Sequence, residues 1–192
     1  MNVEEAIRTR RSIGKVKQDP VPRELLERVI EAAVWAPNHH RTEPWRFVVL
    51  TGEGRRRLGR AYAAIAGEKL DAADAQREQQ LAREAAKALR APVVIAVACS
   101  PSAEEPKVLP AEELAAVHAA VQNMLLAAHA CGLGAIWRSG APAYHPAMKR
   151  ALGFTETDEV VGLIYVGYPD MTPPPAHRSP GADRTAWLTD DA

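Results

Sequence analysis

Three short stretches of this 192-residue chain combine side chains that could bind a ligand. Arg10-Arg11-Ser12 follows a polar helical segment, and Trp137-Arg138-Ser139 ends an apolar run. The third stretch, Ala36–Phe47, carries two histidines and an arginine between prolines. Paired guanidinium groups beside a hydroxyl can clamp a phosphate, and an indole offers a flat apolar wall. The three stretches therefore indicate a site for an anionic and partly aromatic ligand.

Each arginine stretch also has a plainer interpretation. Most exposed arginines bind nothing specific, so Arg10-Arg11-Ser12 could be a solvated basic turn. In the second stretch, Trp137 could belong to the core and Arg138 to the surface. Residue type alone leaves these alternatives open.

The histidines do not predict a metal site. His39 and His40 are adjacent on one loop, where both side chains rarely reach one ion, and no spaced carboxylate or cysteine partner is evident. His118 and His129 are eleven residues apart on one predicted helix, about 16 Å along its axis. We predict structural or interfacial roles for these two.

Sequence motifs for self-sufficient catalysis are missing. Gly52-Glu53-Gly54 follows an apolar run, but Arg57 occupies the third glycine position of a dinucleotide fingerprint. No G-x-S-x-G elbow is present, and Cys131 lies at a predicted helix C-terminus, where the dipole disfavours a thiolate. Anion clamps without an acid–base or nucleophile constellation are typical of a protein whose bound cofactor does the chemistry.

Composition excludes several classes of partner. Lys+Arg and Asp+Glu each number 24, so the net charge is zero, which argues against nucleic acid or an acidic membrane surface. The N-terminus lacks an apolar signal core, and no run of about 18 apolar residues exists. Cys99 and Cys131 form no C-x-x-C pair, so we expect a reducing compartment, the cytoplasm.

Periodicity and punctuation predict an α+β fold, with a mostly antiparallel or mixed sheet covered by helices. The unbroken apolar run Val93–Cys99 predicts a central strand buried on both faces. The apolar segment Ala115–Leu126 predicts a helix buried all round, in a core or between subunits. The other expected helices cover about Asn2–Arg8, Pro22–Pro37, Pro146–Leu152 and two or three mostly exposed segments within Arg55–Leu89; the other expected strands are Arg46–Leu50, Ala135–Ser139 and Val160–Tyr168.

We expect one domain over residues 1–192, because this length fits one hydrophobic core. Residues 169–192 form a proline-rich tail. A segment of this composition cannot bury itself, so we expect it to lie along another surface.

Taken in order, these stretches resemble the nitroreductase family. Arg10-Arg11-Ser12 comes first, and Ala36-Pro37 is followed after six residues by Pro44-Trp45-Arg46-Phe47. Gly132-Leu133-Gly134 then precedes a strand, and the last strand ends in Gly167-Tyr168-Pro169. The resemblance runs from about residue 10 to residue 169, is strongest for a short single-domain branch of NAD(P)H nitroreductases, and is weakest in the tail.

The resemblance implies an intertwined homodimer with FMN at the subunit interface, reduced by NAD(P)H and reoxidised in a ping-pong cycle by a nitroaromatic, quinone or similar small acceptor. The flavin, as the hydride carrier, leaves no catalytic residue to assign. The residues implied to bind it in the same subunit are Arg10, Arg11, Ser12, Trp137, Arg138 and Ser139, with Arg178 of the tail completing the phosphate site. Trp35 and His39 are implied to reach the flavin of the other subunit.

This chain departs from the family pattern in the loop before Pro44. Glu43 stands where the family commonly has an amide, which places a negative charge near the expected flavin. Trp35 is bulky and could narrow the substrate cleft. A flavin carrier or sensor without turnover, and a purely structural dimer, remain the alternative functions. The sequence does not identify the acceptor or the preferred nicotinamide.

Overall fold

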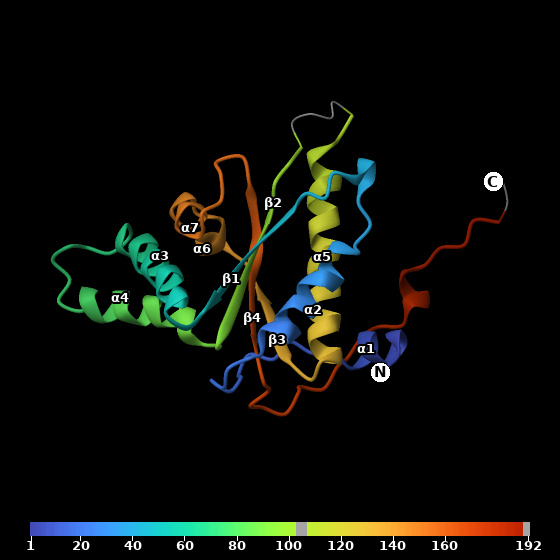
Figure 1. The fold of residues 1–192 in the computed structure, drawn as a ribbon, viewed down its shortest axis with the longest axis horizontal. Coiled ribbons are helices and arrows are strands. Elements are labelled where there is room, and N and C mark those ends of the chain that lie inside the picture. The colour runs from blue at the N-terminus through green and yellow to red at the C-terminus, as the bar shows by residue number, and fades with distance from the viewer. Residues whose placement is uncertain (103–106, 190–192) are drawn as a thin grey trace.

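A four-stranded antiparallel sheet lies between two helical layers in the computed structural model, which describes residues 1–102 and 107–189 (Figure 1). The strands are β1 (Trp45–Thr51), β2 (Val93–Cys99), β3 (Gly134–Arg138) and β4 (Glu159–Gly167), in the spatial order β1-β2-β4-β3. The predicted α+β class is confirmed, and the sheet is antiparallel throughout. β2 is central and buried at every residue, as predicted.

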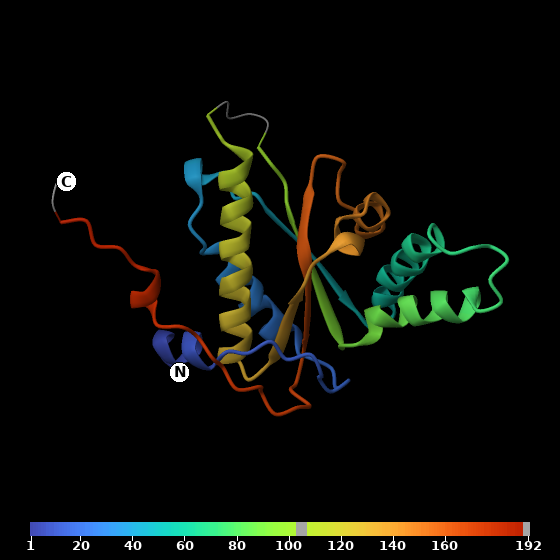
Figure 2. The same cartoon turned by 180° about the vertical axis from the view of Figure 1, so that it is seen from behind.

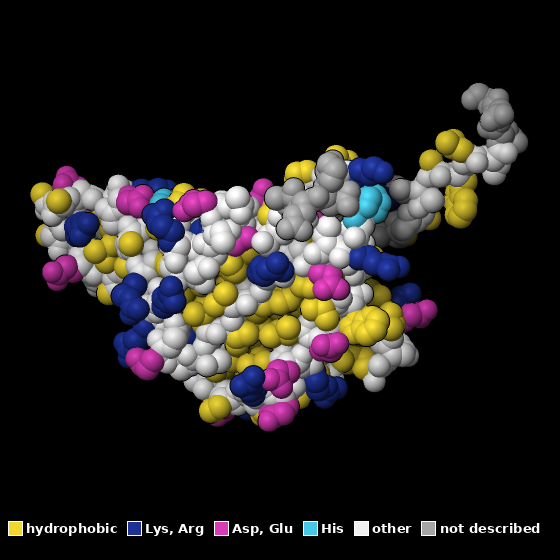
Figure 3. Space-filling model, turned by 45° about the horizontal axis from the view of Figure 1, so that its top comes forward, with side chains coloured by type: hydrophobic (Ala, Val, Ile, Leu, Met, Phe, Trp, Pro, Cys, Tyr) yellow, Lys and Arg dark blue, Asp and Glu magenta, His cyan; other side chains and the backbone are white. Residues whose placement is uncertain are grey.

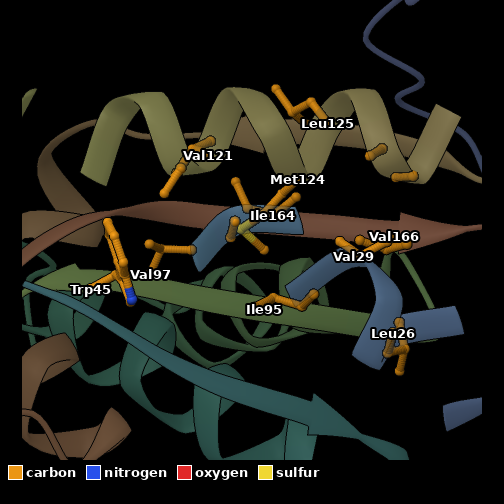
Figure 4. Close-up of a cluster of buried hydrophobic side chains, with 14 of the residues drawn as sticks. Leu26, Val29, Trp45, Ile95, Val97, Val121, Met124, Leu125, Ile164 and Val166 are labelled. Carbon is orange, nitrogen blue, oxygen red and sulfur yellow. The ribbon is translucent and has the colours of Figure 1, made fainter. Parts of the chain in front are cut away.

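The first helical layer packs α5 (Pro110–Ala130) and α2 (Arg23–Val34) against one face of the sheet, with α1 (Val3–Thr9) at the end of α5 (Figure 2). Alternate residues of β2, among them Ile95 and Val97, point into this layer and meet Val29, Val121 and Met124 (Figure 4). This alternation is the period-2 geometry of a strand covered on both sides.

The second layer covers the opposite face and consists of α3 (Arg55–Gly67), α4 (Arg77–Ala86), α6 (Ala141–Tyr144) and α7 (Pro146–Leu152). The expectation that the Arg55–Leu89 helices are mostly exposed is wrong for α3. Its apolar side, including Leu58, Tyr62 and Ile65, is buried against Val94 and Leu163. α4 buries no residue, and the α3–α4 pair projects from the body (Figure 1).

The longest helix, α5, is buried on one side within the single subunit, so burial all round in its own core is excluded, and burial between subunits stays a prediction. Ala116, Val117, Ala120, Val121 and Met124 are buried, whereas Ala115, His118 and Gln122 are exposed and Ala119 and Leu126 are half-buried. The apolar composition of this helix therefore leaves a weakly polar strip on its outer side. No helix of the described ranges is long and apolar enough to cross a membrane.

The tail beyond Pro169 runs away from the body along α1 and is exposed wherever it is described (Figures 1 and 2). Trp187 and Leu188 are 85% and 93% exposed. The last residues of the predicted tail lie outside the described residues.

Candidate functional site

The N-terminal arginine stretch is fixed beside the start of β3. Asn2 caps α1 by accepting a 2.9 Å hydrogen bond from the Glu5 N–H, and the chain then leaves the helix at Arg10. Ser12 forms a parallel bridge with Ala135, and the Ile13 N–H donates to the Ala135 carbonyl at 3.0 Å. Gly134 permits this crossing, because a Cβ there would lie 2.8 Å from Ile13 Cγ2.

A hollow of about 200 Å³ lies at this crossing, which we call the arginine hollow. It is lined by Thr9, Arg10, Arg11, Ile13, Leu125, His129, Gly132, Leu133, Ala135, Pro169 and Pro173. The Arg10 pKa is lowered, first by burial and then by the positive charges of Arg11 and Arg178. The charge of Arg178 in the tail therefore acts on Arg10, and its part in a phosphate site stays a prediction.

The guanidinium groups of Arg10 and Arg11 in this hollow, and that of Arg178, form no ion pair with a carboxylate in the described part of the chain. The Nη1 atom of Arg11 donates to the Arg8 and Arg10 carbonyls at 2.7 and 2.8 Å, but its Nε is buried without a partner. The Arg10 guanidinium makes no hydrogen bond within the described residues. Uncompensated cations around one hollow are what a bound dianion would neutralise.

His129 belongs to the arginine hollow, a role that the sequence analysis missed. Its Nε2 lies 2.8 Å from Thr9 Oγ1, and its pKa is lowered, first by burial and then by Arg10 and Arg11. The eleven-residue spacing between His118 and His129 bore only on whether the two histidines could bind one metal ion. The position of His129 in the last turn of α5, just before the strand that receives Ser12, becomes meaningful only once the two segments are seen to meet.

The second predicted stretch lies at the opposite end of β3. Arg138 is three residues beyond Ala135, about 10 Å along the strand. Trp137 faces the α2–α5 layer and Arg138 the other layer, because neighbouring side chains of a strand point to opposite faces. Ser139 is exposed just after the strand.

Trp137 is held in one orientation across β4. Its Nε1–H donates to the Val161 carbonyl at 3.2 Å, and its ring centroid lies 5.6 Å from that of His118. A Cβ at Gly162 would lie 2.1 Å from the indole nitrogen, so only glycine leaves room for this ring. The alternative that Trp137 is simply core is half right, since the ring is half-buried and packs against the core.

Arg138 and two further cations border a second hollow, of about 360 Å³, which we call the β3-end hollow. The Arg138 Nε is buried without a partner, and its Cζ lies 5.7 Å from the Tyr165 ring centroid. The full lining is Tyr62, Lys87, Arg90, Ile136, Trp137, Arg138, Ser139, Pro142 and Ala143.

The opening loop lies at the other end of α5. His39 Nδ1 is 2.9 Å from Glu112 Oε2 in the first turn of that helix, while His129 lies in its last turn. Seventeen residues of α-helix separate these two positions, about 25 Å. The same subunit therefore does not bring His39 to the arginine hollow.

The loop backbone is strained. His40, Arg41 and Glu43 have φ values of 59°, 57° and 48°, in the left-handed region that non-glycine residues rarely occupy. The Glu43 N–H donates to Asn38 Oδ1 at 3.1 Å, which holds the turn closed. Such strain collects at ligand-binding positions.

Trp35 ends α2 and stands out from the surface. It is 78% exposed, and its Nε1–H donates to Glu31 Oε1 at 3.1 Å. Asn123 donates to the Ala32 carbonyl at 3.1 Å, which ties this end of α2 to the middle of α5. Trp35 is therefore a rigidly mounted aromatic side chain with no cover from its own subunit.

Known proteins resemble this chain in sequence and in fold. The chain matches the Nitroreductase family over residues 7–168. It is 32% identical to "Putative NAD(P)H nitroreductase YfhC" of Bacillus subtilis, over 93% of this chain and 90% of that protein. A nitroreductase-like family protein of Bacillus cereus superposes with a TM-score of 0.82 at 30% identity, covering 99% of this chain and 97% of that one.

A further solved structure is described as "a putative nitroreductase in complex with fmn" from Desulfovibrio desulfuricans. It has a TM-score of 0.72 and 28% identity, and the match covers 100% of this chain and 98% of that one. A family match across most of the chain, with relatives of the same length and fold, leaves one assignment: the chain belongs to the nitroreductase family.

Proposed function

We propose that this protein is an FMN-dependent oxidoreductase that passes electrons from NAD(P)H to a small acceptor such as a nitroaromatic or a quinone. Family membership and the FMN named with the Desulfovibrio structure support this proposal. The observation that carries it is the arginine hollow, where the Arg11 Nε is buried without a hydrogen-bond partner among the described residues.

The phosphate of FMN fits the arginine hollow. Arg10, Arg11 and Arg178 supply positive charge there without a competing carboxylate, and the exposed Ser12 hydroxyl lies at the hollow's edge on the bridge to β3. The buried and unpartnered Nε of Arg11 is the orphaned donor that an anion would satisfy.

The ring system fits the other end of β3. The interval of about 10 Å from Ala135 to Arg138 separates the phosphate clamp from Trp137, Arg138 and Ser139. Trp137 and its neighbours offer apolar walls, and the Arg138 cation lies where it can stabilise negative charge on a reduced ring.

We further propose that each site is completed by a second copy of the chain. Trp35 is uncovered, and His39 lies about 25 Å along α5 from the arginine hollow, so these residues can serve only a flavin held by another subunit. The outer strip of α5, with Ala115, Ala119 and Leu126, provides a contact surface for the second copy.

An apolar face supports the same association. Figure 3 shows hydrophobic side chains gathered over one side and bordered by charged ones. Contiguous apolar surface of this kind marks a protein interface. The exposed tail, with Trp187 and Leu188, is proposed to wrap the partner subunit as part of one domain over residues 1–192.

The protein's own side chains bind the cofactor and position its ring. When bound, FMN supplies acceptance of a hydride from NAD(P)H and its release as two electrons and a proton to the acceptor. The arginines anchor the phosphate, and Trp137 covers one side of the ring site against water.

Among the described cysteines, Cys99 is buried with its pKa raised to about 12, chiefly by burial, so it does not act as a nucleophile. We place the activity in the cytoplasm, consistent with unpaired cysteines.

An absorbance spectrum of the purified protein tests the proposal. We expect flavin bands that bleach on adding NADH or NADPH without oxygen and return with a quinone or a nitroaromatic. Comparing the two nicotinamides identifies the preferred donor. Protein that stays colourless after incubation with FMN would refute the proposal, and flavin that binds but never turns over would favour a carrier or sensor.

A further inference from the structure

The β3-end hollow contains more positive charge than the flavin proposal uses. Lys87 and Arg90 border it from the segment after α4, and Arg138 enters from β3. Glu84 pairs with Lys87 at 2.5 Å, but neither Arg90 nor Arg138 has a carboxylate partner among the described residues. One carboxylate therefore faces three cations.

Hydrogen-bond donors in the hollow are also left over. The Arg138 Nε is buried without an acceptor. Tyr62 Oη and Tyr165 Oη lie 3.2 Å apart, and burial raises the pKa of both hydroxyls, so the pair stays neutral at physiological pH. Tyr62 lines the hollow and adds a polar group without adding a negative charge.

The remaining walls are apolar. Ile136, Trp137, Pro142 and Ala143 line the hollow beside the cations. A volume of about 360 Å³ lies at the small end of the range for ligand pockets, enough for a single substituted ring and too small for a whole dinucleotide. The combination favours a flat ring that carries an oxyanion.

We propose that the β3-end hollow binds the carboxylate of an aromatic acid, so that the preferred electron acceptor is an acidic arene. This inference rests on the proposed function, because it places the acceptor beside the ring end of the flavin site. Lys87 and Arg90 hold the carboxylate, Arg138 remains directed at the flavin ring, and the apolar walls hold the ring of the acid.

The kinetic test compares 4-nitrobenzoate with its neutral analogue 4-nitrobenzamide on the FMN-loaded protein. We expect kcat/KM to be about tenfold higher for the acid, the scale of one charge-assisted hydrogen bond. Arg90→Gln should remove most of that preference by lowering kcat/KM for the acid far more than for the amide. Arg57→Gln is the matched control, because Arg57 is exposed on α3 and does not line the hollow.

A binding measurement separates this inference from the flavin proposal. Calorimetric titration with benzoate should show binding that Arg90→Gln weakens and Arg57→Gln does not, and benzamide should bind more weakly than benzoate. Equal rates for acid and amide, or an Arg90→Gln effect on the KM for NAD(P)H instead, would overturn the inference even when the protein binds and turns over FMN. Failure of the protein to bind FMN would refute the proposed function, and the benzoate titration would still test the hollow.

Discussion

The two ends of α5 differ in the charged groups that surround them. At its C-terminal end, His129 joins Arg10 and Arg11 around a hollow with cations and no carboxylate partner. At its N-terminal end, Glu112 pairs with His39 in a loop with left-handed backbone at His40, Arg41 and Glu43. The C-terminal end of α5 supplies cations that could bind an anion, and the N-terminal end supplies the loop that carries His39. This difference is what the proposal of a site shared by two subunits requires.

Removing residues 171–192 should have the largest effect on this arrangement. The tail carries Arg178, whose charge acts on Arg10, and exposes Trp187 and Leu188, which the single subunit does not cover. We expect the shortened protein to sediment as a monomer and to be purified without flavin. A shortened protein that remains a flavin-loaded dimer would show that the tail does not join the subunits.

Arg10→Ala should weaken FMN binding by about 1.5–3 kcal/mol, the cost of a lost hydrogen bond to a charged group. Arg11→Ala should cost less, because part of its guanidinium is bonded to the Arg8 and Arg10 carbonyls. Fluorescence titration of the flavin-free protein measures both affinities. Arg8→Ala removes an exposed charge from the same segment and serves as the control. An Arg10→Ala affinity equal to that of Arg8→Ala would contradict the phosphate assignment.

Gly162→Ala tests the ring end. The added Cβ cannot coexist with the present Trp137 indole, so the ring must move, at a cost of about 1–3 kcal/mol in the free energy of unfolding. We expect a lower thermal midpoint and an altered visible spectrum of the bound flavin. An unchanged spectrum in a destabilised variant would show that Trp137 does not touch the flavin.

The smallest effect concerns pH at the clamp. The His129 pKa is lowered in the folded flavin-free protein, so the unfolded chain binds more protons as the solution is acidified. His129 therefore supports stability above its unfolded pKa, near 6.5, and loses that contribution as pH falls below it. A bound phosphate favours the protonated ring and should reverse the trend.

Thermal melting between pH 5 and 8, with and without FMN, measures this effect. His129→Gln should flatten the difference between the two series. Identical pH profiles for the wild-type protein with and without FMN would remove His129 from the phosphate site.

The sequence predicted the parts whose signals are local. The helix over about Asn2–Arg8, the buried strand Val93–Cys99 and the helix that ends near Cys131 each follow from neighbouring residues, and each is confirmed. The exposure of α4 but not α3 could not be predicted, because both segments are amphipathic and only the sheet decides which one is covered.

The site was less predictable than the fold. The left-handed backbone of His40, Arg41 and Glu43 has no glycine signal, since contacts from Asn38 and Glu112 impose it. The place of His129 in the clamp depends on a contact across 120 residues. Single-sequence patterns report spacing within an element and not which distant elements meet.

Purified mixed dimers test the central claim that two subunits share each site. One subunit carries Arg10→Ala with Ser12→Ala, the other carries Trp35→Ala with His39→Ala, and two different tags select the mixed species. Each parent homodimer has two damaged sites, whereas the mixed dimer has one site with both lesions and one intact site. The account predicts that the mixed dimer binds one FMN with wild-type affinity. Mixed dimers with both sites equally impaired would contradict it.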